Sequence, residues 1–289
     1  MKPAPFAYFA PTSVEEAVGL LAAHADEAKV LAGGQSLVPL MNMRLAKPAV
    51  LVDINRVAAL DYIRWEDGYL AVGAITRQRV LERAPEVAAR VPLIRETLYY
   101  LGHAQIRNRG TIGGNLAHAD PASELPATLL ALGGELRVVG PAGERVLQPE
   151  EFFLTYLTTA LAPDELLVEA RFRLPRRRHG GAFAEISRRH GDYALVGVAV
   201  QLELTDDGRI ARAGIGLCGA GAVPIKATAA EALLTGERPS DALFAEAAVR
   251  AAGQAEPESD IHASAEYRRD MVRVLTARAL RQALARASA

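Results

Sequence analysis

Two glycine pairs constrain this chain more than any other feature of its sequence. Residues 32–36 read Ala-Gly-Gly-Gln-Ser, and residues 111–115 read Thr-Ile-Gly-Gly-Asn. Glycine lets the backbone adopt positive φ and approach a ligand closely. Successive backbone N–H groups can then form a concavity that suits an anion. Ser36, Thr111 and Asn115 add side-chain donors, so the two motifs together predict a diphosphate held from two sides.

Neither motif matches the P-loop or the Rossmann signature. A P-loop requires Gly-x-x-x-x-Gly-Lys followed by Ser or Thr, and a Rossmann fold requires Gly-x-Gly-x-x-Gly after a strand. A single glycine pair is weak evidence, because ordinary turns use it constantly. The second glycine pair also lies beside hydroxyl and amide side chains. This repetition favours a ligand-binding role for the two motifs over a role as ordinary turns.

The composition limits the class of protein. Of the 289 residues, 50% are hydrophobic and 23% are charged, which is typical of a globular protein with one large or two smaller domains. Lys and Arg number 33 against 34 Asp and Glu, so the chain lacks the basic excess of a general nucleic-acid binder. We expect no signal peptide and no transmembrane segment, because no apolar run approaches the ~20 residues that a spanning helix needs.

The cysteine count and the histidine spacing argue against a metal centre. Cys218 is the single cysteine, and it cannot form an internal disulfide, hold an iron–sulfur cluster or build a cysteine-based zinc site. We therefore expect a reducing, cytoplasmic location. The six histidines show no metal-binding spacing, and no Gly-x-Ser-x-Gly motif indicates a serine hydrolase.

Periodicity divides the chain into an N-terminal and a C-terminal part. Residues 1–56 read as helix, strand, glycine loop, helix and strand, and residues 57–175 mix helices with strands. The polar segment 175–181 is rich in Pro, Arg and Gly and predicts a linker. After it, strands are predicted at 182–187, 194–204 and 210–218, and helices at 228–234, 241–252 and 265–287.

With their flanking residues, the two motifs resemble those of a known family. Residues 32–39 (AGGQSLVP) and 111–126 (TIGGNLAHADPASELP) are similar to the FAD-binding motifs of the medium subunit of molybdenum hydroxylases. That family includes carbon monoxide dehydrogenase and the bacterial xanthine dehydrogenases. The resemblance covers nearly the whole chain, including residues 188–194 (RRHGDYA) and the final helix with Tyr267.

The resemblance implies an α+β fold. A FAD-binding domain of the PCMH, or vanillyl-alcohol-oxidase-like, type would span 1–175, with subdomains at about 1–56 and 57–175. A C-terminal antiparallel sheet with helices would span 176–289. The implied activity is that of an oxidoreductase subunit, which transfers electrons through FAD from [2Fe–2S] clusters of a small partner subunit to an external acceptor.

The resemblance also implies the partners. The molybdenum–pterin centre would lie in a large partner subunit, and the complex would be a dimer of heterotrimers. One branch of the family carries an additional cysteine-bound cluster in this subunit, and the single cysteine excludes that branch.

A set of cofactor contacts follows from the same resemblance. The backbone amides of both motifs would hold the FAD diphosphate, and Glu124 corresponds to an acidic residue at the polar part of FAD. Tyr193 corresponds to a position beside the isoalloxazine ring, where an aromatic side chain can cover it. The implied FAD-binding residues are Ala32, Gly33, Gly34, Gln35, Ser36, Leu101, Thr111, Gly113, Gly114, Asn115, Glu124, Leu166 and Tyr193, with no catalytic residue.

Two alternative functions remain open from the sequence. A stand-alone FAD-dependent oxidase or dehydrogenase of the same fold would bind its substrate itself, often with a covalent flavin link through His or Cys near the first motif, where this chain has Gln35. A non-catalytic scaffold would use the glycine motifs only as turns and would be colourless. The sequence identifies neither the substrate nor the acceptor, for which quinone, NAD and oxygen all remain open.

Overall fold

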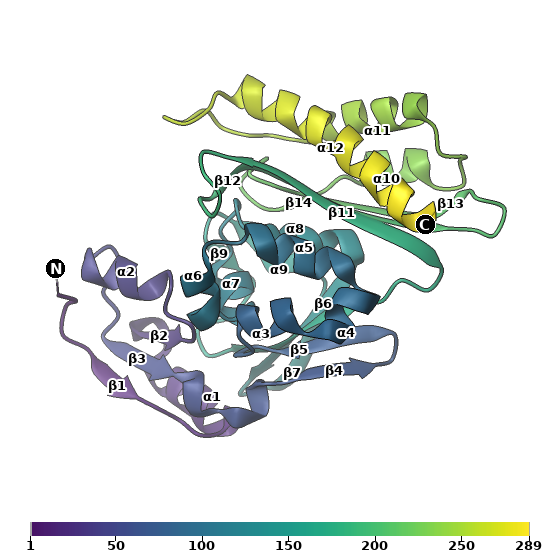
Figure 1. Cartoon of the computed structure of the whole chain (residues 1–289). Coiled ribbons are helices and arrows are strands. Elements are labelled where there is room, and N and C mark those ends of the chain that lie inside the picture. Colours follow the sequence, from purple (N-terminus) through teal and green to yellow (C-terminus); the bar gives the residue numbers. More distant parts are fainter. Residues whose placement is uncertain (1, 289) are drawn as a thin grey trace.

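The computed structural model describes residues 2–288, which form sheets of three, five and four strands and a two-stranded hairpin (Figure 1). The first sheet is parallel, in the order β1-β3-β2, and its central strand is buried. Its elements are β1 (Ala7–Phe9), α1 (Val14–His24), β2 (Ala28–Leu31), α2 (Leu37–Asn42) and β3 (Val50–Asp53), with the 3-10 helices η1 (Ala25–Glu27), η2 (Ile54–Arg56) and η3 (Ala58–Leu60).

The second sheet is antiparallel, in the order β4-β5-β10-β6-β7. Its strands are β4 (Ile63–Glu66), β5 (Tyr69–Gly73), β6 (Gly134–Gly140), β7 (Gly143–Leu147) and β10 (Leu166–Arg173). Six helices lie between β5 and β6 in the chain, namely α3 (Gln78–Arg83), α4 (Pro85–Arg90), α5 (Pro92–Tyr100), α6 (Ala104–Arg109), α7 (Ile112–His118) and α8 (Glu124–Leu132). Helix α9 (Pro149–Phe152) precedes the hairpin of β8 (Phe153–Thr155) and β9 (Thr158–Thr159).

The third sheet is antiparallel and follows the order β11-β12-β13-β14. Helices α10 to α12 cover one face, and α5 and α8 pack on the other (Figure 1). Because both faces are covered, β12 is a nearly continuous apolar run with little alternation. The elements are β11 (Arg178–Ser187), β12 (Ala194–Leu204), β13 (Ile210–Cys218), β14 (Ile225–Lys226), α10 (Thr228–Leu234), α11 (Asp241–Gly253) and α12 (Ala265–Ser288).

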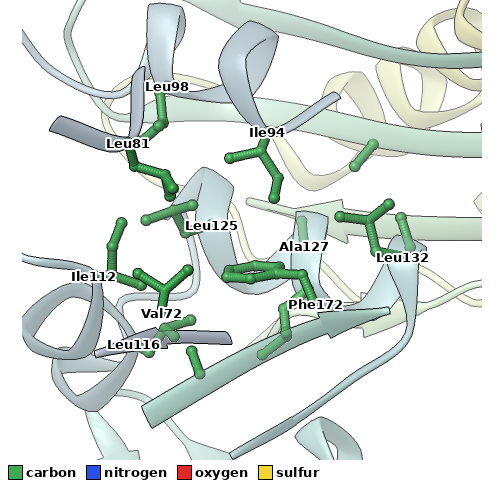
Figure 2. Close-up of a cluster of buried hydrophobic side chains, with 14 of the residues drawn as sticks. Val72, Leu81, Ile94, Leu98, Ile112, Leu116, Leu125, Ala127, Leu132 and Phe172 are labelled. Carbon is green, nitrogen blue, oxygen red and sulfur yellow. The ribbon is translucent and has the colours of Figure 1, made fainter. Parts of the chain in front are cut away.

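Helix α8 joins the second and third sheets. All nine of its residues are buried, because it packs against β10 on one side and against β12 and β13 on the other. Figure 2 shows Leu125, Ala127 and Leu132 of α8 around Phe172 of β10. On the opposite side, a β-carbon added to Gly216 of β13 would lie 1.9 Å from the carbonyl oxygen of Ala127. Glycine therefore lets the strand approach the helix closely.

The structure confirms the predicted α+β class and corrects several details. The second glycine motif is not a loop, because Gly113 and Gly114 lie in the first turn of α7. The predicted linker 175–181 is shorter, because Arg178 already pairs with Leu204 in the third sheet. Strands β1 and β4 were not predicted, since both are short and only partly buried.

Candidate cofactor site

The fold brings the two glycine motifs into direct contact. A β-carbon added to Gly33 would lie 2.6 Å from the carbonyl oxygen of Arg109, 2.8 Å from the Cα of Gly110 and 3.1 Å from the amide nitrogen of Thr111. One added to Gly114 would lie 3.5 Å from the β-carbon of Ala32. Residues about eighty positions apart in the sequence therefore form one continuous surface of the candidate site.

Two side chains bridge the motifs. The Asn55 amide donates from Nδ2 to the carbonyl oxygen of Ala32 at 2.8 Å, and Arg77 donates to Asn55 Oδ1 at 2.5 Å. Arg77 also donates to the carbonyl oxygen of Arg109, just before the second motif. Asp53 fixes Asn55 by accepting its backbone N–H at 2.9 Å. These contacts hold the first motif against the second.

We expect the bridge to matter for cofactor retention. Asn55→Ala should weaken FAD binding about tenfold, because it removes the hydrogen bonds to both Ala32 and Arg77. Titration of the FAD-free chain with FAD, followed by flavin fluorescence, measures the change. Asn55→Asp keeps an acceptor for Arg77 and should lose less affinity than Asn55→Ala.

The first motif leaves a run of backbone donors unused. Within residues 2–288, the N–H groups of Gly33, Gly34, Gln35 and Ser36 donate no hydrogen bond to another residue. Gly34 has φ +73°, which turns the chain sharply, and the Gln35 side chain donates back to the Gly33 carbonyl at 3.1 Å. Consecutive free amides at such a turn can bind an anion. The first motif therefore fits the diphosphate of a dinucleotide.

The backbone amides of the second motif donate to acceptors within the protein. The N–H of Gly113 donates to the Ala74 carbonyl at 2.9 Å, and that of Gly114 donates to Thr111 Oγ1 at 3.0 Å. The N–H of Asn115 donates to the Thr111 carbonyl at 3.1 Å. Thr111 is therefore the N-cap of α7, and these amides already have acceptors. The motif supports the first one sterically and presents the Asn115 side chain.

Asn115 connects the second motif to Glu124. Its Oδ1 accepts a hydrogen bond from Ser123 Oγ at 2.9 Å, and Ser123 is the N-cap residue of α8. Asp120 shapes the intervening turn by accepting the Ala122 N–H at 2.9 Å. Glu124 is only 4% exposed. Burial raises the pKa of its carboxyl group to about 8, and the neighbouring carboxylate of Glu185 adds to this rise.

Tyr193 lies beside the first motif. Loss of hydration raises the pKa of its hydroxyl, Asp120 and Glu124 add to the rise, and the adjacent Ser36 side chain opposes it. The side chain as a whole is nevertheless 61% exposed. Its neighbour Ala194 lies against Gly219, whose N–H donates to the Pro121 carbonyl at 2.8 Å, so the structure brings Tyr193 near the turn that precedes Glu124.

The two leucines among the implied FAD-binding residues are part of the hydrophobic core. Leu101 is 5% exposed and packs in the cluster around α5, α7 and α8, and its carbonyl oxygen accepts from Arg107 at 3.0 Å. Leu166 is 3% exposed and lies in a different cluster, against which Ala32 also packs. The structure therefore does not bring these two side chains together.

Asn55 and Arg77 were not predicted from the sequence. Each follows a strand that supports the site, β3 for Asn55 and β5 for Arg77. A polar side chain just after a buried strand was the available signal, but the partner of each residue depends on tertiary contacts. In the described chain no three His, Cys, Asp or Glu side chains gather as a metal site requires. No helix among residues 2–288 is long and apolar enough to cross a membrane.

A second buried carboxyl group, Glu185, makes stability depend on pH. Both of its oxygens are buried without a hydrogen-bond partner among residues 2–288. Burial raises its pKa from 4.5 to about 7. Between these values the folded chain keeps a proton that the unfolded chain releases, so stability falls as the pH rises.

Glu185→Gln should remove part of this pH dependence. The wild-type melting temperature should fall from about pH 5 to about pH 8, and the variant should lose less and be the more stable of the two at the higher pH. Thermal unfolding followed by circular dichroism at both pH values measures the difference. Glu86→Gln, at an exposed position on α4, serves as control; an identical profile for wild type and Glu185→Gln would contradict the prediction.

The fold and the paired motifs define the class of FAD-binding proteins, and comparison with known families identifies the family. A model of the FAD binding domain in molybdopterin dehydrogenase matches residues 4–176. A model of the CO dehydrogenase flavoprotein C-terminal domain matches residues 181–283. The chain belongs to the family of FAD-binding subunits of molybdenum hydroxylases.

Individual relatives match over almost their full length. The chain is 43% identical to subunit alpha of the 6-hydroxypseudooxynicotine dehydrogenase complex of Paenarthrobacter nicotinovorans, covering 99% of this chain and 97% of that one. It is 38% identical to the carbon monoxide dehydrogenase medium chain of Afipia carboxidovorans, over 99% of each chain. A solved structure of carbon monoxide dehydrogenase from Hydrogenophaga pseudoflava superposes with a TM-score of 0.96, at 38% identity over 99% of each chain.

Proposed function

We propose that this chain is the FAD-carrying, electron-transferring subunit of a molybdenum hydroxylase complex. The observation that carries the proposal is the run of four consecutive backbone amides, from Gly33 to Ser36, that lack acceptors within residues 2–288 and lie against a second glycine motif. Bound FAD would supply the redox chemistry, accepting electrons from [2Fe–2S] clusters of a partner and passing them to an external acceptor.

The chain's own residues would hold and shield the cofactor. The amides of the first motif would bind the diphosphate, and Asn115 would add a side-chain donor from α7. Glu124, buried and protonated near neutral pH, could donate a hydrogen bond to a polar group of FAD without placing a negative charge beside the phosphates. Tyr193 would cover the ring system, and Leu101 and Leu166 would support the site from the core.

We propose partners that supply what this chain lacks. A large subunit with the molybdenum–pterin centre and a small subunit with the [2Fe–2S] clusters would complete the complex, as a dimer of heterotrimers. Cys218 is buried and is the single cysteine, so the chain cannot build a cluster itself. A free thiol is also compatible with a cytoplasmic location. We further propose 1–175 and 176–289 as the domains.

The proposal is tested by purifying the chain with its co-expressed genomic neighbours. Flavin absorbance that survives gel filtration supports FAD binding, and iron and molybdenum that co-purify with two further chains support the complex. Flavin without these partners would favour the stand-alone flavoenzyme. A colourless chain that takes up no FAD would favour the non-catalytic scaffold as its function.

A further inference from the structure

Residues 188–193, which join β11 to β12, contact aromatic side chains of α5. The ring of His190 lies with its centroid 4.8 Å from that of Tyr99, tilted by 41°, and 6.3 Å from that of Tyr100, in an edge-on arrangement. Tyr100 in turn packs 5.3 Å from Phe183, which is 1% exposed. His190 is therefore linked through Tyr100 to the core.

A second imidazole contacts the same segment. A β-carbon added to Gly191 would lie 2.7 Å from Cε1 of His103, so the ring of His103 lies directly against the backbone of the segment. Gly191 has φ +85°, which favours glycine. The Asp192 N–H closes the turn by donating to the Arg189 carbonyl at 3.1 Å. The segment is thus held where α5 ends and α6 begins.

Beyond these contacts the segment ends at Tyr193. Tyr193 adjoins Ala194, whose carbonyl oxygen would lie 3.1 Å from a β-carbon added to Gly219, and the Gly219 N–H donates to the Pro121 carbonyl at 2.8 Å. Tyr193 therefore lies near the turn that precedes Glu124, but it is 61% exposed. Packing around the tyrosine itself therefore does little to fix its place. The position of Tyr193 depends on the backbone that leads to it. Two residues earlier the ring of His103 lies against the backbone of Gly191, and three residues earlier the side chain of His190 packs on Tyr99.

We propose that His190 and His103 are positioning residues that hold Tyr193 over the cofactor site. They act through the backbone of residues 188–193 and do not themselves touch the cofactor. The proposal rests on the proposed function in one respect, which is that Tyr193 faces FAD. Without the ring contacts of His190 with Tyr99 and Tyr100, the segment would move away from α5 and uncover the ring system.

The first test needs no cofactor. Trypsin can cleave after the exposed Arg188 and Arg189, and Arg176 and Arg177 provide a reference site in the same chain. In the FAD-free chain, His190→Ala should raise cleavage at the first pair relative to the second about fivefold, because one aromatic contact is lost. His190→Phe keeps a ring on Tyr99 and should behave like the wild type.

A neighbouring histidine provides the matched control. His262 contacts Arg188 at 3.2 Å but makes none of these ring contacts. His262→Ala should therefore change the cleavage ratio much less than His190→Ala. Equal ratios for the two alanine variants, or an effect of His190→Phe as large as that of His190→Ala, would overturn the positioning role.

The second test uses the FAD-loaded chain. Iodide quenching of flavin fluorescence reports how well the ring is covered, and the quenching constant should rise severalfold in His190→Ala but not in His190→Phe. If cleavage increases while quenching stays unchanged, the segment does not cover the flavin and the proposal is wrong. If the wild-type chain takes up no FAD, the proposed function fails, while the cleavage ratio still reports the positioning by His190.

Discussion

Gly33→Ala should purify with at least about tenfold less flavin than the wild type, because the added β-carbon has no space. It would lie 2.6 Å from the carbonyl oxygen of Arg109 and 2.8 Å from the Cα of Gly110, both of which are backbone atoms that no side-chain rotation can move. The clash can be relieved only if the two glycine motifs separate. That movement would displace the free backbone amides of the first motif from the anion site. The ratio of flavin absorbance to protein absorbance measures the loss.

The matched control is Gly19→Ala, on the exposed face of α1. A β-carbon there meets nothing within 4 Å, and alanine favours the helix by roughly 0.5–1 kcal/mol. This variant should keep its flavin. Circular dichroism should show that Gly33→Ala remains folded, which separates loss of the site from loss of the fold. A folded Gly33→Ala variant with wild-type flavin content would contradict the prediction.

Gly216→Ala should destabilise the chain by about 3 kcal/mol, because it overpacks the contact between β13 and α8. The β-carbon would lie 1.9 Å from the carbonyl oxygen of Ala127 and 2.7 Å from its carbonyl carbon. Helix α8 cannot retreat easily, since its other side packs against β10. Urea unfolding followed by circular dichroism measures the lost free energy of unfolding.

Gly253→Ala is the control for this variant. Gly253 is the last residue of α11, and a β-carbon there meets nothing within 4 Å. Its free energy of unfolding should stay within about 0.5 kcal/mol of the wild type. Equal stability of Gly216→Ala and the wild type would mean that strand and helix are less closely packed than the structure indicates.

The elements that could be predicted from the sequence are those with a strong local pattern. The limits of β12 and β13 agree with the prediction, because long apolar runs bounded by turn residues define them. The nature of the second glycine motif could not be predicted, because two glycines disfavour a helix. The helix forms there because Thr111 caps it and because Ala74 accepts the Gly113 N–H.

The site shows the same limit. The resemblance named Glu124 and Tyr193, and both lie near the turn that precedes α8, while their contacts with FAD remain predictions. Asn55 and Arg77 were not predicted, because their bridge joins elements 22 residues apart through side chains whose directions depend on the finished fold. Spacing in the sequence carries no signal for such a contact.

Helix α8 offers solvent no face, and this restricts how the chain can be recombined. A chain truncated after the second sheet would leave the apolar surface that faces β12 and β13 in water, where it would promote aggregation. Chimeras that exchange C-terminal halves between relatives should fold only when α8 and the third sheet come from the same relative. The third sheet and α8 must then be exchanged together, although more than forty residues separate them in the chain.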